Sequence, residues 1–124
     1  MSLRVLIIED HTDTAISTAA LLRCAGYEVR IAPTAAAGLK AAGEFRPRAI
    51  LCDIALPQMS GYEVARALRR NPALAQVYLV AISGYGREED QQRAFAAGFD
   101  QHFIKPVDFE VLRQLLGALP NGQD

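Results

Sequence analysis

Five polar side chains able to bind a cation or a phosphate stand out, because each comes at the end of a short apolar run. They are the acidic pair Glu9 and Asp10, then Asp53, Ser83 and Lys105. Three carboxylates held close together repel one another, so their charge needs a compensating cation. Lys105 offsets one charge. A divalent cation bound through oxygen, such as Mg²⁺, Mn²⁺ or Ca²⁺ rather than Zn²⁺, offsets the rest.

Each of these signals alone is also typical of an ordinary turn. An acidic pair at a strand end commonly caps a helix, and Asp53 stands shortly before Pro57 and Gly61, which suit a turn. Ser83-Gly84 and Lys105-Pro106 are common at strand ends. A set of unrelated turns does not explain why such residues follow four different apolar runs of one chain.

Five segments predict the strands that position these residues. Residues 5–8, 49–52 and 77–82 are unbroken apolar runs rich in β-branched residues, which is typical of strands buried on both faces of a parallel sheet. Residues 28–31 alternate between polar and apolar types and predict a half-exposed edge strand. Residues 102–104 predict a short fifth strand.

Between the strands, apolar residues recur at helical spacing and predict five helices. Thr34 is a candidate N-cap, Gly26 and Gly98 are candidate helix ends, and the third helix is expected to stop before Pro72. The positions that mark the five helices are Ala15, Ala19 and Leu22; Ala35, Leu39 and Ala42; Val64, Ala65 and Leu68; Ala94 and Phe95; and Val111, Leu112, Leu115, Leu116 and Leu119.

Five alternations of strand and helix predict an α/β fold with one doubly wound, five-stranded parallel sheet. Right-handed crossovers favour the flavodoxin-like strand order 2-1-3-4-5. In that order a site forms where the strand order reverses, beyond the carboxyl ends of strands one and three. We expect one domain over residues 1–119 and a tail or linker over 120–124.

Composition excludes several classes of function. The 124 residues carry a formal net charge of −1, which gives no support for direct binding to nucleic acid or to an anionic membrane. No apolar run has the length of a membrane span or a signal peptide, so a cytoplasmic location is expected. Cys24 and Cys52 stand in apolar surroundings, which predicts two buried, unreactive thiols.

The combined pattern resembles the response-regulator receiver family of two-component signalling. The resemblance is carried by Glu9-Asp10, the segment Asp53-Ile54-Ala55-Leu56-Pro57-Gln58-Met59-Ser60-Gly61-Tyr62-Glu63, Ser83-Gly84 and Lys105-Pro106, and it runs from about residue 5 to residue 119. Within it, residues 83–108, with Gly84-Tyr85-Gly86 and Gly98-Phe99-Asp100, most resemble receivers of hybrid sensor histidine kinases.

The resemblance implies that Asp53 accepts a phosphoryl group from the phosphohistidine of a histidine kinase or a phosphotransfer domain. It implies that Mg²⁺, with Mn²⁺ as the alternative, is held by Glu9, Asp10, Asp53 and the backbone carbonyl of Ala55. It also implies that Lys105 pairs first with Asp53 and then with a phosphoryl oxygen.

The resemblance further implies a conformational switch. Ser83 would donate to a phosphoryl oxygen, and His102 occupies the switch position, where the family usually has an aromatic ring. The output surface would run from Ser83 through the last helix toward an unidentified effector, and homodimerisation is left open. The bend at Lys105-Pro106 would be a cis peptide bond. Such a protein is a signalling phosphoacceptor that catalyses only its own phosphorylation and slow dephosphorylation.

Three alternatives remain open at this point. A degenerate receiver would bind partners without ever being phosphorylated. An aspartate-nucleophile phosphatase would have a second aspartate two positions after the first, where this chain has Thr12. A flavodoxin-type carrier would bind the flavin phosphate at a helix start, and Glu9 and Asp10 would repel it there.

Overall fold

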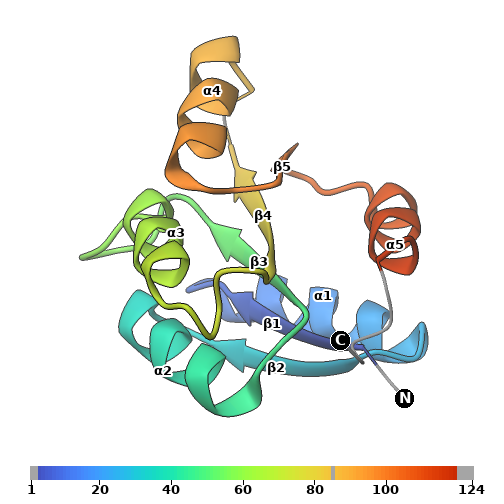
Figure 1. Cartoon of the computed structure of the whole chain (residues 1–124). Helices are drawn as coiled ribbons and strands as arrows, with labels where there is room; N and C mark the ends of the chain where they lie inside the picture. Colours follow the sequence, from blue (N-terminus) through green and yellow to red (C-terminus); the bar gives the residue numbers. More distant parts are fainter. Residues whose placement is uncertain (1–2, 85, 120–124) are drawn as a thin grey trace.

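The computed structural model describes residues 3–84 and 86–119, and in these residues five strands alternate with five helices (Figure 1). Each strand has the predicted position, and its ends differ only at terminal residues. The tail predicted for residues 120–124 lies outside the described residues. The elements are β1 (Arg4–Ile8), α1 (Thr12–Cys24), β2 (Glu28–Ala32), α2 (Ala35–Phe45), β3 (Ala49–Asp53), α3 (Gly61–Arg70), β4 (Tyr78–Ser83), α4 (Glu88–Ala97), β5 (Gln101–Ile104) and α5 (Phe109–Gly117).

The strands form one parallel sheet in the order β2-β1-β3-β4-β5, as predicted. Helices α1 and α5 cover one face, and α2, α3 and α4 cover the other (Figure 1). The register places Ile8 beside Cys52 and Asp53 beside Ile82. The carboxyl ends of β1, β3 and β4 therefore reach the same edge of the sheet.

Two apolar layers hold the sheet between the helices. Successive residues of a strand point to opposite faces, so β1 sends Leu6 and Ile8 into the layer under α2, α3 and α4, and sends Val5 and Ile7 into the layer under α1 and α5. All four are at most 3% exposed. This double burial explains why the strand sequence is apolar throughout instead of alternating.

The predicted helix signals are confirmed at several ends. The Thr34 hydroxyl accepts a hydrogen bond from the Ala37 backbone N–H at 3.0 Å and caps α2. Ser60 and Glu63, which were not singled out in the sequence, form a capping box at the start of α3. Gly98 ends α4 with φ of 118°, a left-handed conformation that favours glycine.

The predicted burial of Cys24 was wrong, because this residue is exposed. Phe95 and Val111, which mark two of the predicted helices, are also largely exposed, at 50% and 47%. The physical reason is helix geometry, since neighbouring residues lie about 100° apart around the axis. Ala94 and Leu112 take the inward positions next to Phe95 and Val111. Cys24 lies two residues after the buried Leu22 and so points away from the core.

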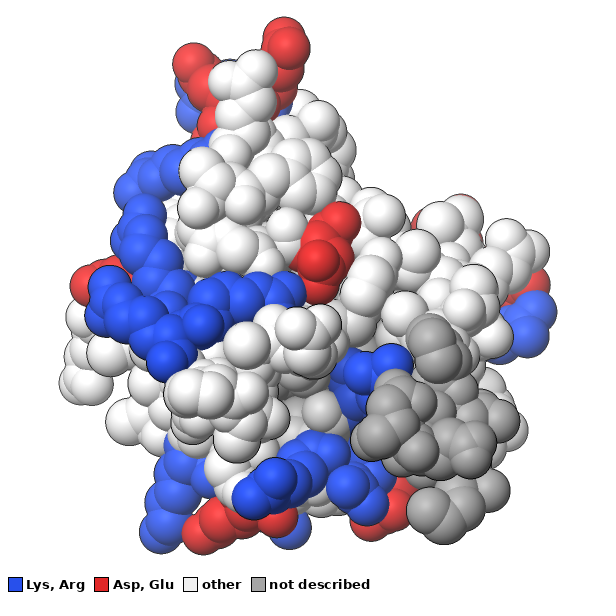
Figure 2. All heavy atoms as spheres, viewed as in Figure 1, with Lys and Arg blue, Asp and Glu red and all other residues white. Residues whose placement is uncertain are grey.

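The outer surface is charged at the tip of α4. Figure 2 shows acidic side chains gathered at the top of the view, and the first turn of α4 carries Glu88, Glu89 and Asp90. Carboxylates are favourable there because a helix N-terminus carries partial positive charge. Among the described residues, every helix is too short or too polar to cross a lipid bilayer.

Arg69 of α3 ties together three segments at the opposite end of the sheet from Asp53. Its guanidinium donates to the backbone carbonyls of Gly98, Ala75 and Val77 at 2.9, 2.8 and 2.7 Å, and to Asp100 Oδ2 at 2.8 Å. Several carbonyls share this one donor group, so its loss leaves them without their partner.

We expect Arg69→Met to lower the free energy of unfolding by about 2–4 kcal/mol, because it deletes several charge-assisted hydrogen bonds at once. Arg70 is exposed on the same helix and provides the matched control. Arg70→Met should change the stability by no more than about 0.5 kcal/mol. Urea unfolding of both variants measures the difference, and equal effects would show that the Arg69 contacts add nothing.

Candidate functional site

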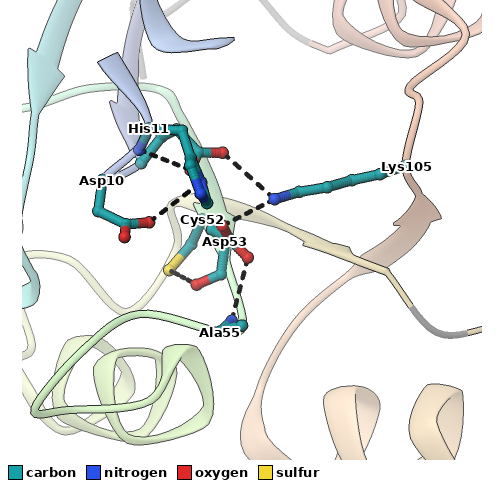
Figure 3. A network of polar contacts seen from close by, with 7 residues as sticks. Asp10, His11, Cys52, Asp53, Ala55 and Lys105 are labelled. Carbon is teal, nitrogen blue, oxygen red and sulfur yellow. Dashed lines mark hydrogen bonds and ion pairs between the residues drawn. The ribbon is translucent and has the colours of Figure 1, made fainter. Parts of the chain in front are cut away.

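Four of the five predicted polar residues converge at the carboxyl ends of the strands (Figure 3), and they are Glu9, Asp10, Asp53 and Lys105. Glu9 and Asp10 follow β1, Asp53 ends β3, and Lys105 follows β5. One donor atom each from Glu9, Asp10, His11 and Asp53 lies within 4.8 Å of all the others. The parallel sheet produces this convergence because all its strands end at one edge.

Asp53 is the centre of the site and is 2% exposed. Its Oδ1 accepts a hydrogen bond from the Ala55 backbone N–H at 3.0 Å, and its Oδ2 accepts one from Lys105 Nζ at 2.9 Å. Lys105 extends across from the end of β5, and the peptide bond between Lys105 and Pro106 is cis. The buried carboxylate is therefore held from two sides.

Gly61, at the start of α3, packs closely behind Asp53. A Cβ atom at this position would lie 2.7 Å from the Asp53 carbonyl oxygen and 2.8 Å from Ile54 Cα. Both neighbours are backbone atoms that cannot rotate away, so only glycine fits without moving the end of β3. The glycine of the sequence motif thus has a packing role at the site.

The charges of the site do not balance. Burial raises the pKa of Glu9, and the negative charge of Asp53 raises it further. Burial lowers the pKa of Lys105, but its hydrogen bond to Asp53 and the charges of Asp53 and Glu9 outweigh this and leave the pKa raised. Lys105 therefore stays an ammonium ion, and it is a single positive charge beside three carboxyl groups.

The donor set fits a divalent cation. Asp10 Oδ1 is buried and has no hydrogen-bond partner among the described residues, although a buried carboxylate oxygen ordinarily has one. The oxygens of Glu9 and Asp53 lie within 4.8 Å of an oxygen of Asp10. A cation bound by these oxygens would satisfy Asp10 and reduce the repulsion among the carboxylates.

The raised pKa of Glu9 gives a test of this electrostatic description. In the pH window above about 4.5, the folded protein holds the Glu9 proton more tightly than the unfolded chain, so stability falls as the pH rises. Without metal at pH 7, Glu9→Gln should therefore raise the free energy of unfolding, by about 1 kcal/mol. The gain should shrink as the pH falls toward about 4.

Urea unfolding of metal-free protein across that pH range measures the effect. Glu28→Gln is the control, because Glu28 is an exposed glutamate at the start of β2. A Glu9→Gln variant that is less stable than the unchanged protein at pH 7 would contradict the description. Such a loss would mean that the hydrogen bonds of Glu9 outweigh its desolvation.

The two residues assigned to the switch contact each other directly. Ser83 Oγ and His102 Nε2 form a hydrogen bond of 2.8 Å, and Ser83 is 5% exposed. Burial lowers the pKa of His102, while the charge of Asp90 opposes this, so the neutral ring is favoured. His102 Nδ1 is buried and has no hydrogen-bond partner in the described residues.

Sequence reasoning missed two parts of the site. The first is His11, whose Nδ1 lies 3.1 Å from Glu9 Oε2; its position directly after Asp10 was the available signal. The second is a cavity of about 560 Å³ that adjoins Asp53 and Lys105. Its α1 side carries hydroxyl groups at helical spacing, from Thr14, Ser17 and Thr18.

Comparison with known proteins gives consistent results over nearly the whole chain. The family model of the response regulator receiver domain matches residues 5–117. An uncharacterized 14.6 kDa protein from Leptolyngbya boryana is 33% identical over 110 residues, which are 88% of this chain and 84% of that protein. The flavodoxin-like fold of the receivers is the one found here.

One similar solved structure holds a metal ion. The receiver domain of the sensor histidine kinase PA1611 from Pseudomonas aeruginosa was crystallised with a magnesium ion coordinated in its active-site cleft. It is 26% identical, has a TM-score of 0.85, and the match covers 94% of this chain and 95% of that chain.

Other relatives are longer than this chain. The DNA-binding dual master transcriptional regulator RpaA of Synechocystis is 33% identical over 116 residues, which are 94% of this chain and 48% of that protein. This chain therefore spans about half the length of that relative.

Proposed function

The chain belongs to the response regulator receiver domain family, and on that premise we propose that Asp53 is the phosphoacceptor of a two-component signalling system. The observation that carries the proposal is the environment of the Asp53 carboxylate. It is buried, hydrogen-bonded to Lys105 at 2.9 Å, and adjoined by two further carboxylates and a cavity. A carboxylate placed in this way is a nucleophile beside groups that neutralise added negative charge.

The proposed reaction is transfer of a phosphoryl group from a phosphohistidine of a histidine kinase or phosphotransfer domain. A bond forms between phosphorus and an Asp53 carboxylate oxygen, while the bond between phosphorus and the donor imidazole nitrogen breaks. The electron pair of the broken bond returns to the imidazole. Lys105 stands beside the carboxylate that gains the charge, and its ammonium group would bind the transferred phosphoryl oxygens.

Receiver domains bind Mg²⁺ at an acidic pocket, and here Glu9, Asp10, Asp53 and the backbone carbonyl of Ala55 are the groups proposed to hold it. When bound, the cation supplies positive charge to the phosphoryl oxygens during transfer. The buried oxygen of Asp10, which has no hydrogen-bond partner among the described residues, and the crowding of the three carboxylates support this assignment. Mn²⁺ has the same preference for oxygen ligands and is the expected substitute.

We propose that the signal leaves through Ser83 and His102. A phosphomonoester adds a charge of about −1.5 to −2, and we assume a similar charge for the acyl phosphate on Asp53. The Ser83 hydroxyl would then exchange its hydrogen bond with His102 for one with a phosphoryl oxygen. That exchange would free His102 on β5 and shift the surface formed by α4, β5 and α5, where Phe95 and Ile104 are exposed.

Incubation with acetyl phosphate and Mg²⁺ tests the proposal without a known kinase. We expect the intact mass to rise by one phosphoryl group in the presence of Mg²⁺ and to stay unchanged when a chelator removes it. A receiver known to be phosphorylated serves as the positive control. No mass gain under conditions that modify the control would favour the alternative of a degenerate receiver that only binds partners.

A further inference from the structure

His11 is the one member of the acidic cluster whose ring offers nitrogen. Its Nδ1 lies 3.1 Å from Glu9 Oε2 and 3.6 Å from Asp10 Oδ1, and Figure 3 shows the ring turned toward Asp10. Within the described residues, all of its polar side-chain contacts are with this acidic pair. The imidazole thus shares the position in which the carboxylates would hold a cation.

The local backbone leaves the ring available. His11 is the N-cap residue of α1, and its backbone N–H donates to Glu9 Oε2 at 3.1 Å. Its side chain makes no capping hydrogen bond. The side chain is 68% exposed, so it can turn slightly without disturbing the core. Helix capping therefore does not explain the direction of the ring.

The distances suit ligands that share one ion. A six-coordinate ion with bonds of about 2.1 Å keeps adjacent ligands about 3 Å apart and opposite ligands about 4.2 Å apart. The distances of 3.1 and 3.6 Å from Nδ1 to the two carboxylate oxygens fall between these limits. The full set of four donors lies within 4.8 Å, which small side-chain rotations reduce to the required spacing.

Nitrogen changes which metals the site prefers. Oxygen ligands alone suit Mg²⁺, whereas imidazole suits later first-row metals and strengthens their binding in the order Mn²⁺, Fe²⁺, Co²⁺, Ni²⁺. Mg²⁺ gains little from an imidazole ligand because it is a hard ion that keeps its water. A ring nitrogen at this cluster therefore makes the site discriminate between metals more strongly than the carboxylates alone would.

We propose that His11 is a nitrogen ligand of the bound cation, so that this site favours first-row transition metals over Mg²⁺ more strongly than its carboxylates alone would, while Mg²⁺ still binds through the oxygens. The proposal rests on the cation site of the proposed function and assigns its metal preference. It also replaces the oxygen-only donor set expected from the sequence with a mixed set of one nitrogen and several oxygens.

Pulsed EPR of the Mn²⁺-loaded protein tests for the nitrogen directly. The chain has only two histidines, His11 and His102, so an imidazole nitrogen coupled to Mn²⁺ comes from one of them. We expect the ¹⁴N modulation of a coordinated imidazole in the unchanged protein and in His102→Gln, and its loss in His11→Ala. Absence of the modulation in the unchanged protein, or its persistence in His11→Ala, would overturn the assignment.

Calorimetric titration measures the selectivity. In a Cys24→Ser background, which removes the exposed thiol as a competing ligand, His11→Ala should weaken Co²⁺ binding by at least about tenfold and Mg²⁺ binding by less than about threefold. Equal weakening of both metals would show that His11 acts only through its hydrogen bond to Glu9, and would refute the proposal.

The outcome is separable from that of the proposed function. If His11 is not a ligand, Mg²⁺-dependent phosphorylation of Asp53 by acetyl phosphate still proceeds in His11→Ala. If Asp53 is not a phosphoacceptor, that reaction fails in every variant, while the ¹⁴N modulation still reports whether His11 binds the metal.

Discussion

Replacement of Asp53 by asparagine is expected to abolish phosphorylation, not merely to slow it. The amide keeps the shape of the side chain but has no negative charge and is a poor nucleophile toward phosphorus. Among the described residues, Asp53 is the one carboxylate that is both hydrogen-bonded to Lys105 at 2.9 Å and 2% exposed at the end of β3. Intact-mass measurement after incubation with acetyl phosphate and Mg²⁺ records the result.

Asp13→Asn is the matched control for this variant. Asp13 is an exposed aspartate in the first turn of α1, at the same end of the sheet. The two substitutions change the net charge equally, so a general electrostatic effect would appear in both. Phosphorylation that survives in Asp53→Asn at the rate of the unchanged protein would place the acceptor elsewhere.

Replacement of Lys105 by methionine is expected to slow phosphorylation by about 100- to 1,000-fold, the usual cost of losing one donor that stabilises transition-state charge. Methionine has an unbranched side chain of similar length but lacks the ammonium group. That group is 2.9 Å from Asp53 Oδ2 and 3.7 Å from Glu9 Oε1, so it faces the place where the negative charge of the phosphoryl group arrives. The rate constant at saturating Mg²⁺ is the quantity to compare.

The chain provides its own control, since Lys40 is the only other lysine and is exposed on α2. Lys40→Met should leave the rate unchanged. Saturating Mg²⁺ matters because loss of Lys105 also removes a positive charge that competes with the cation at the carboxylates. A Lys105→Met variant as fast as Lys40→Met would remove Lys105 from the proposed mechanism.

Much of the fold was predictable because buried parallel strands have a strong sequence signal. The apolar runs that form β1, β3 and β4 are buried on both faces, which predicts a parallel sheet and its strand order. That strand order in turn places Asp10, Asp53 and Lys105 at one edge of the sheet. Topology, rather than any single motif, made the convergence of these residues predictable. Their atomic contacts were not predictable from it.

The features that the sequence did not predict are ones that residue spacing does not determine. Phe95 and Val111 are apolar but lie beside the residues that take the inward positions, and only the packed structure shows which neighbour is buried. The hydrogen bonds of Arg69 join carbonyls that are far apart in the sequence. The direction of the His11 ring depends on local rotation, which residue types do not reveal.

Some interpretations from the sequence stay predictions. They are the likeness of residues 83–108 to receivers of hybrid sensor histidine kinases, the cytoplasmic location, the existence of an effector, and dimerisation.

The contact between Ser83 and His102 at 2.8 Å gives the switch a definite starting state. It does so because a half-buried imidazole, whose neutral form is favoured, holds the hydroxyl that the phosphoryl group would have to attract.

The central claim is that Asp53 carries the phosphoryl group as an acyl phosphate, and chemical mapping of the modified residue tests it most directly. Sodium borohydride reduces an aspartyl phosphate to homoserine, which peptide mass analysis locates. After phosphorylation with Mg²⁺, we predict homoserine at position 53 and at no other aspartate. Homoserine at another position, or none while a control receiver is converted, would contradict the account.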